Sequence, residues 1–251
     1  MKYKSTTIKS KWEKSSWLLM NPELSNYVPK TLLFNKENLT SMLSSYSTVY
    51  FKPTGGSGGF NIMRITKKDK SYQTQYNTVK STYSTIDRLY NKLHRFSNKR
   101  SFLLQYGIDL AKTKGRPFDI RVMVQKTNKG TWVSSAVFTK IGKSGRVATN
   151  YNQGGKIGYF HETMLGAGYK SADIQQMESR LKELGVSVGK TFDQHRNGFK
   201  ELGLDVALDS KAKPWILEVN TRPQFYPLKK MKDKKVYQRI VSYSKQYGRH
   251  K

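Results

Sequence analysis

At residues 50–59 the chain reads YFKPTGGSGG. A β-rich run, 48–52, ends in Lys52, and four glycines then let the chain turn back into a second run, 60–66, whose alternation suits a partner strand. Glycines let backbone N–H groups approach phosphate oxygens, and the lysine adds a positive charge. The stretch lacks the Gly-Lys-Ser/Thr of a Walker loop, and Asn61 stands where the dinucleotide fingerprint has its last glycine. The stretch therefore predicts a phosphate-binding hairpin. Without support from other motifs, a flexible glycine hairpin explains it as well.

A second stretch, WILEVN at residues 215–220, places Glu218 and Asn220 two positions apart. On a strand such residues point to the same face. The neighbouring strand-like run 204–208 carries Asp205. Mg²⁺ prefers carboxylates together with substrate phosphates, so the three side chains predict a magnesium site. The alternative is a strand with one polar, solvated face.

A third stretch, FDIRVMV at residues 118–124, carries Arg121 on the opposite face from Ile120 and Val122. If the apolar face packs inward, Arg121 faces a polar groove. There its guanidinium can fork onto a carboxylate or a phosphate. An internal salt bridge with Asp119 or another neighbour explains the same pattern equally well.

The remaining periodicity predicts an α+β fold. Apolar residues recur at helical spacing over 36–46, 84–96 and 173–192, and further strand-like runs cover 102–105, 118–125 and 131–141. We divide the chain into a short N-terminal segment (1–46), a small lobe with the glycine loop (47–105), a large lobe with the metal site (106–228) and a basic tail (229–251). The tail has nine Lys/Arg against Asp233 and predicts a solvated helix or a flexible arm.

Composition limits the function classes. Of 251 residues, 46 are Lys or Arg and 17 are Asp or Glu, giving a net charge of +29 that favours an anionic partner. Without cysteine there can be no disulfide or thiolate chemistry, and a reducing, cytoplasmic location is expected. No apolar run approaches the roughly 20 residues of a membrane span. The four histidines lack metal-site spacing, and the Gly-x-Ser-x-Gly at 55–59 is not followed by a helix, which disfavours a hydrolase.

The order of motifs along the chain resembles the ATP-grasp superfamily. The motifs are Lys-Pro with the glycine loop, Leu-Leu-Gln, Asp-Ile-Arg-Val, Asn-x-x-Gly-Gly, Gly-x-Asp and Glu-Val-Asn, spread over residues 11–223. The YheC/YheD-type, endospore coat-associated branch is most similar, with Lys11-Trp12, VPKT at 28–31 and YFKP at 50–53. Ribosomal-protein glutamate ligases are similar more distantly.

This resemblance implies two α+β lobes that clasp ATP, Lys52 at the α/β-phosphates and a hinge at 105–108 that reads adenine through its backbone. The nucleotide-binding residues would be Lys11, Lys52, Gly55, Gly56, Ser57, Gly58, Gly59, Gln105, Tyr106, Gly107 and Ile108. The magnesium ligands would be Asp205, Glu218 and Asn220. Arg121 and Asn150 would be catalytic residues facing the transferred phosphate or the substrate.

Three features depart from the superfamily pattern. Relatives commonly have arginine before the Gly154-Gly155 pair, whereas this chain has Gln153. After Glu-Val-Asn many show Pro-Gly, whereas Arg222-Pro223-Gln224 follows here. The Rossmann-like domain that usually precedes the ATP-binding lobes is missing or reduced to residues 1–46, so a partner protein is one source of a substrate domain.

The resemblance implies an ATP- and Mg²⁺-dependent carboxylate–amine ligase that forms an acyl phosphate. Its substrate would be an acidic peptide, an acidic polymer or a small carboxylate, which also accounts for the charge of +29. The alternatives are an ATP-grasp kinase and a non-catalytic, nucleotide-binding spore-coat or scaffold protein. Binding to nucleic acid would also fit the charge, but the tyrosines are scattered rather than grouped with Lys and Arg in a stacking motif.

Overall fold

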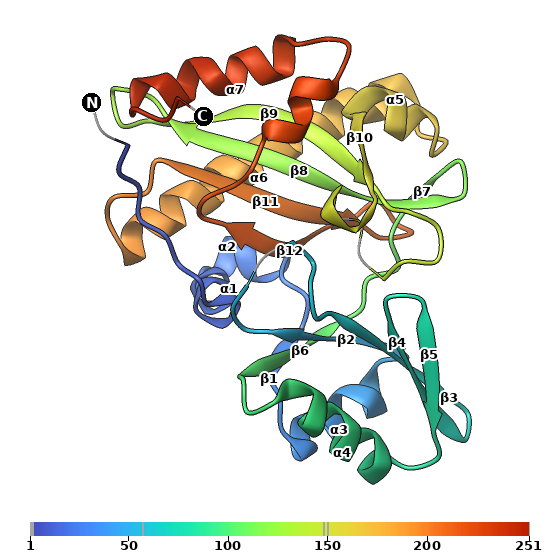
Figure 1. Cartoon of the computed structure of the whole chain (residues 1–251). Coiled ribbons are helices and arrows are strands. Elements are labelled where there is room, and N and C mark those ends of the chain that lie inside the picture. The colour runs from blue at the N-terminus through green and yellow to red at the C-terminus, as the bar shows by residue number, and fades with distance from the viewer. Residues whose placement is uncertain (1–2, 57, 148, 150, 251) are drawn as a thin grey trace.

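The chain forms two lobes, each built on its own antiparallel sheet (Figure 1). The computed structural model describes residues 3–56, 58–147, 149 and 151–250. Three short elements lie within the residues of the large lobe: β7 (Lys112–Thr113), which pairs with β8 (Arg116–Lys126), η1 (Tyr151–Gln153) and α5 (Phe160–Leu165). None of the described helices is long and apolar enough to cross a membrane.

The small lobe has a six-stranded sheet in the order β1-β6-β2-β3-β4-β5. The strands are β1 (Thr31–Leu33), β2 (Thr48–Pro53), β3 (Met63–Lys68), β4 (Ser71–Tyr76), β5 (Val79–Tyr83) and β6 (Phe102–Tyr106). Helices α3 (Lys36–Ser45) and α4 (Ile86–Ser97) lie on one side of this sheet (Figure 1). Their apolar stripes, including Leu39 and Leu89, pack on Phe51 and Ile65 of the sheet. The expected second strand of the glycine hairpin begins at Met63 rather than at residue 60.

The large lobe has the sheet order β10-β9-β8-β11-β12. The strands are β8 (Arg116–Lys126), β9 (Trp132–Ile141), β10 (Lys156–Tyr159), β11 (Glu201–Leu208) and β12 (Pro214–Asn220). Helices α6 (Ser171–His195) and α7 (Lys235–Gln246) cover opposite faces. The alternation of β8 explains this arrangement, because Val122 and Val124 pack on the α6 side while Met123 packs on the α7 side.

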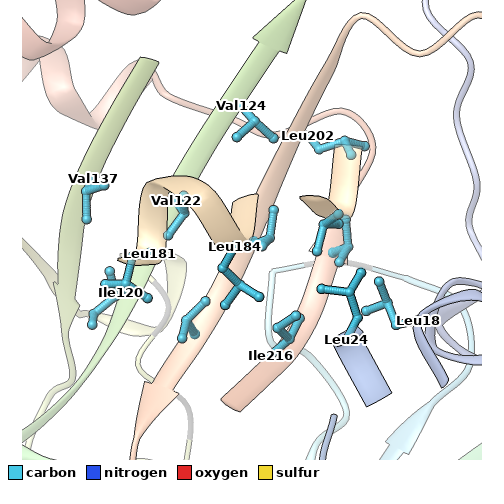
Figure 2. Packing of buried hydrophobic residues seen from close by; sticks show 14 of the residues in the cluster. Leu18, Leu24, Ile120, Val122, Val124, Val137, Leu181, Leu184, Leu202 and Ile216 are labelled. Atoms are coloured by element: carbon cyan, nitrogen blue, oxygen red, sulfur yellow. The ribbon is translucent and has the colours of Figure 1, made fainter. Parts of the chain in front are cut away.

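Helix α6 lies close to its sheet because it has glycines where the two surfaces meet. In Figure 2, Leu181 and Leu184 of α6 lie over Ile120 and Val122 of the sheet. A Cβ atom added at Gly185 would approach the Cγ1 atom of Val124 to 2.8 Å. The helix predicted over 173–192 is therefore confirmed, and it is the main cover of one face of the large lobe.

The first 46 residues do not pack as one unit. Helices α1 (Lys11–Met20) and α2 (Pro22–Ser25) pack on the large lobe through Trp17, Leu18 and Leu24. In contrast, β1 and α3 belong to the small lobe. The expected boundary at residue 46 therefore falls inside the small lobe, whose first strand is β1.

The basic C-terminal segment is docked on the large lobe. After the turn η2 (Tyr226–Lys230), residues 235–246 form α7, which agrees with the helical alternative. However, Ile240, Tyr247 and Arg249 are buried, so the segment is not a flexible arm. Most of its lysines remain exposed.

Candidate nucleotide-binding site

Lys52 joins the two lobes at the end of β2. Its ammonium group donates to Oε1 of Gln105 on β6 at 2.6 Å and to the backbone oxygen of Leu217 on β12 at 3.3 Å. The side chain is buried, and this burial lowers its pKa to about 8, even though the nearby Glu218 carboxylate acts in the opposite direction. Lys52 is therefore a pre-positioned cation between the lobes.

The glycine loop is held against α1. The backbone N–H of Lys11 donates to the oxygen of Thr54 at 2.6 Å, and its Nζ atom donates to the oxygen of Gly56 at 2.6 Å. Gly56, Gly58 and Gly59 have φ angles of 95°, 75° and 74°, a region that favours glycine. Ser57, predicted to bind nucleotide, lies outside the described residues.

Helix α1 delivers two ammonium groups to Glu218. The Nζ atoms of Lys11 and Lys14 lie 3.4 Å and 4.0 Å from Oε1 of Glu218. Burial lowers the pKa of Lys14, partly offset by Glu218. Lys14 is not among the site residues predicted from the sequence. A usable signal is its spacing, because Lys11 and Lys14 begin the same buried face that continues to Trp17 and Leu18.

Arg121 and Asp205 are direct partners across β8 and β11, with Nε of the arginine 2.7 Å from Oδ1 of the aspartate. Lys140 of β9 also lies 3.0 Å from that oxygen. Although burial alone raises the pKa of Asp205, Arg121 and Lys140 together hold it well below its usual range. The salt-bridge alternative for Arg121 is therefore observed, with Asp205 as its partner.

Asp119 and Lys140 are a second cross-strand pair, and neither residue is among the site residues predicted from the sequence. The Lys140 Nζ atom lies 3.1 Å from Oδ1 of Asp119, yet neither atom has a well-aligned hydrogen-bond partner among the described residues. The other oxygen, Oδ2, accepts from the Thr149 hydroxyl at 2.5 Å. Burial raises the pKa of Asp119, with Lys140 opposing the shift. The Lys140 ammonium group is thus buried between the carboxylates of Asp119 and Asp205.

The three predicted magnesium ligands lie together. Asn220 Nδ2 is 3.4 Å from Oδ2 of Asp205, and Glu218 sits on the same strand as Asn220. No cluster of three or more Asp, Glu, His or Cys side chains occurs in the part of the chain that the structure describes. Two carboxylates and an amide suit a magnesium ion that takes its other ligands from phosphates and water, and do not suit an all-protein cage.

Two adjoining pockets share Asp205 and Glu218 in their walls. The first, here named the apolar pocket, lies between the lobes and includes Lys52 and Glu218 in its wall. Its other lining residues are Tyr50, Ile62, Gln105, Tyr106, Ile108, Leu110, Asp119, Val147, Thr149, Asp205 and Leu217. Lys52, which precedes the glycine loop, and Glu218, a predicted magnesium ligand, therefore face one cavity.

The second, here named the cationic pocket, contains Arg121, Lys140 and Arg222. It is also lined by Gly58, Gly59, Phe138, Tyr151, Ile157, Asp205, Glu218, Asn220, Pro223, Gln224, Tyr226 and Pro227. Asp205 and Glu218 are common to both pockets. An anion bound in the cationic pocket would thus lie next to whatever occupies the apolar pocket.

The predicted hinge is only partly available to a base. Tyr106 and Ile108 line the apolar pocket, but the side chain of Gln105 binds Lys52 and Thr31. The N–H groups of Tyr106 and Gly107 already donate to Lys30 and Thr48. A Cβ atom at Gly107 would meet Thr48 at 2.5 Å, so this glycine serves close packing. Asn150, predicted to be catalytic, lies outside the described residues.

Solved structures with this fold include D-cycloserine synthetase DcsG, with a TM-score of 0.59 and 11% identity over 94% of this chain and 70% of that one. The ADP complex of purK, an N5-carboxyaminoimidazole ribonucleotide synthetase, has a TM-score of 0.55 and 13% identity over 95% of this chain and 52% of that one. The C-terminal domain of Pby1 from K. lactis, an ATP-grasp enzyme, has a TM-score of 0.53 and 14% identity over 96% and 74%. These identities establish the ATP-grasp fold alone.

A model of the YheC/D-like ATP-grasp family matches residues 1–250, and the chain belongs to this family. It is 26% identical over 224 residues to the endospore coat-associated protein YheD of Bacillus subtilis (strain 168), and 23% identical over 217 residues to YheC of the same organism. These matches cover 86% and 85% of this chain, but 49% and 59% of the relatives. The chain thus spans about half the length of its curated relatives. ATP-grasp proteins are ATP-binding, typically ADP-forming ligases.

Proposed function

We propose that the protein is an ATP- and Mg²⁺-dependent carboxylate–amine ligase that forms an acyl phosphate. The observation that carries this proposal is the shared wall of the two pockets, where Asp205 and Glu218 separate a Lys52-containing cavity from a cavity containing Arg121 and Lys140. A phosphate donor on one side and an anionic acceptor on the other would be held in contact.

The apolar pocket suits the nucleotide. Ile62, Tyr106 and Ile108 offer apolar surface for a base, while Lys52 lies at the same cavity with its ammonium group. Lys11 and the glycine loop lie beside it, joined by the Lys11–Gly56 hydrogen bond. The triphosphate would extend from Lys52 toward the loop and Glu218.

The charge of the site supports the same assignment. Five buried cations (Lys11, Lys14, Lys52, Arg121 and Lys140) lie among three carboxylates (Asp119, Asp205 and Glu218), an excess of two positive charges within the buried part of the site. A complex of one Mg²⁺ with fully ionised ATP carries about two negative charges. The complex would therefore neutralise a site in which unbalanced buried charge is costly.

Asp205, Glu218 and Asn220 would hold the magnesium ion. When bound, Mg²⁺ neutralises phosphate charge and so favours attack on the terminal phosphorus. Arg121 and Lys140 keep Asp205 ionised, since both lower the pKa of its carboxyl group. The Lys140 Nζ atom lies 3.1 Å and 3.0 Å from oxygens of Asp119 and Asp205 and lines the cationic pocket, where it would donate a further hydrogen bond to the transferred phosphoryl group.

The reaction needs no covalent bond to the protein. An acceptor carboxylate oxygen forms a bond to the γ-phosphorus while the bond to the β,γ-bridging oxygen breaks, releasing ADP. The amine nitrogen then attacks the acyl carbon, inorganic phosphate leaves with the C–O bond electrons, and the amine proton passes to solvent. Arg121 and Lys140 align the anions and offset their charge, which is the contribution that the chain makes.

A thermal-shift titration with Mg·ADP tests the nucleotide site. The wild-type Tm should rise by mass action, whereas Lys52→Met and Glu218→Gln should lose most of the rise. Lys92→Gln, an exposed change on α4 of the small lobe, is the matched control and should keep it. Equal shifts in all four proteins would refute the assignment of Lys52 and Glu218.

The reaction class is tested by ADP release and product mass. ADP should form only with a carboxylate and an amine present, an amide should accumulate, and Glu218→Gln should abolish both. A stable phosphoester would instead identify a kinase. Since the curated relatives are named for association with the endospore coat, a coat or scaffold role is the second candidate. It predicts Mg·ADP binding without turnover.

A further inference from the structure

A third hollow adjoins the cationic pocket on the outer surface of the large lobe. It is lined by Tyr3, Lys4, Ser5, Thr6, Thr7, Gly198, Lys200 and Arg222, and is named here the outer hollow. Arg222 lines this hollow as well as the cationic pocket. The three cavities thus form a series from the nucleotide side to the protein surface, joined first by Asp205 and Glu218 and then by Arg222.

The outer hollow is positively charged and has no carboxylate in its lining. Its cations are Lys4, Lys200 and Arg222, and none of them forms an ion pair with any residue in the described ranges. Glu201, next to Lys200 in the sequence, is fully buried and is paired with Arg249. In contrast, Arg121 and Lys11, which lie deeper in the site, are paired with the carboxylates of Asp205 and Glu218.

Arg222 is held where the two cavities meet. Its guanidinium lies over the ring of Tyr3 at 5.6 Å, and the Tyr3 hydroxyl donates to Glu201 at 2.7 Å. The next residue, Pro223, is fixed through its carbonyl oxygen by Arg249 at 3.0 Å.

We propose that the outer hollow is a second anion subsite of the acceptor, and that the acceptor is an acidic peptide with at least two carboxylates. This inference rests on the proposed function and names its substrate class. One carboxylate would react in the cationic pocket, and a second would bind Arg222 and Lys200. A small monocarboxylate would leave these two cations without a partner.

The lining favours a peptide over a nucleic acid. Single-stranded nucleic acids bind largely by stacking their bases on open aromatic rings. The aromatic residue of this hollow is Tyr3, whose ring already packs against Arg222, Arg249 and Tyr247. Charge and hydroxyl groups remain for the ligand, and these suit carboxylates joined by a polar backbone.

Fluorescence anisotropy of labelled hexaglutamate, measured with Mg·ADP present at two salt concentrations, tests the proposal. We compare Lys200→Gln/Arg222→Gln with the matched double variant Lys92→Gln/Arg95→Gln, which removes the same charges from exposed positions on α4. The first variant should bind about tenfold more weakly and the control within about twofold of wild type. The single variant Arg222→Lys should bind hexaglutamate more tightly than the single variant Arg222→Gln, because lysine keeps the positive charge.

Three results would overturn the inference: equal weakening in both double variants, wild-type binding no tighter than that of labelled hexaglutamine, or tighter binding of an oligothymidylate that depends on Lys200 and Arg222. The last would identify a surface for a phosphate polymer. The Mg·ADP thermal shift of each variant, measured alongside, should equal that of wild type. A normal shift with no peptide binding would refute the subsite and leave the nucleotide assignment intact.

Discussion

The ammonium group of Lys52 titrates differently in the folded and unfolded chain. Burial lowers its pKa from 10.5 to about 8, so between these values the unfolded chain binds more protons than the folded one. The free energy of unfolding should therefore rise with pH across this window. Relative to Lys52→Met, which lacks the titration, wild type should gain about 3 kcal/mol between about pH 7.5 and 10.5. Urea denaturation at several pH values measures this, and a pH-independent difference would contradict it.

Gly203 on β11 is required by its neighbours. An added Cβ atom would lie 2.6 Å from Cβ of Pro223 and 3.3 Å from the side chain of Arg121. Gly203→Ala should destabilise the fold by about 1–3 kcal/mol, because Arg121 or Pro223 must shift.

Gly55→Ala is the control for this substitution. Nothing lies within 4 Å of its added Cβ atom, so its free energy of unfolding should stay within about 0.5 kcal/mol of wild type in the same denaturation experiment. If the two variants were equally stable, the close approach at Gly203 would have no energetic consequence.

The alternation of side chains along single strands predicts which residues of β11 and β12 lie together, but it does not predict that Asp119 and Lys140 join them. The two-residue spacing on β12 puts Glu218 and Asn220 beside Asp205, as predicted. Lys140 was not predicted because it lies in the site only through the pairing of β9 with β8. The register of these two strands places it opposite Asp119. A single strand's alternation carries no information on that register. The nucleotide and metal roles of these residues stay predictions.

At the scale of elements, the segment after α7 depends on one buried ion pair. Glu201 at the start of β11 is fully buried and binds Arg249, while Tyr3 and Tyr247 donate to it at 2.7 Å and 2.8 Å. Burial and this carboxylate raise the pKa of Tyr3 to about 12. The N-terminal segment, β11 and the end of the chain are thus joined at one side chain.

Arg249→Met should destabilise the fold by roughly 3 kcal/mol, because it leaves a buried carboxylate without its cation. Glu201→Gln/Arg249→Met should recover at least half of that loss, since no uncompensated charge then remains. Guanidinium denaturation of both variants measures the recovery. A double variant no more stable than the single one would show that packing of Arg249, rather than charge, holds the segment.

Elements with a clear apolar period were predictable, as α3, α4 and α6 illustrate. Helix α1 was not, because its buried face begins with Lys11 and Lys14 and so lacks an apolar stripe. Strands β4 and β5 were also missed. Their sequences, SYQTQY and VKSTY, are polar, and β5 is largely exposed at the sheet edge. Tertiary pairing, not composition, makes them strands.

Over the whole molecule, a net charge of +29 remains after every acidic residue has been counted, so no arrangement of internal ion pairs can lower it. Self-repulsion of this size should destabilise the compact state at low ionic strength. We expect the Tm to rise as sodium chloride increases from about 10 mM to about 150 mM, because the Debye length shortens. Differential scanning calorimetry at several concentrations tests this. A Tm that falls with salt would mean that attractive pairs such as Lys126–Asp193 outweigh the repulsion.

A few polar contacts hold the two lobes together. Lys52 reaches Leu217 across the cleft, and Lys11 reaches Gly56. On the other side, Gln75 of β4 donates to the oxygen of Gly145 at 2.8 Å. The family match and the solved structures confirm the predicted two-lobed ATP-grasp architecture. Its two lobes could be predicted from motif order, but these bridging contacts could not, because they join residues far apart in sequence.

The wall shared by the apolar and cationic pockets has a practical consequence for dissecting the protein genetically. Any allele at Asp205 or Glu218 alters two compartments at once, so its phenotype cannot be attributed to either. Separation-of-function alleles must come from residues that face one compartment, such as Ile108 for the first and Tyr226 for the second. A complementation screen that pairs these two classes would assign each phenotype to its own compartment.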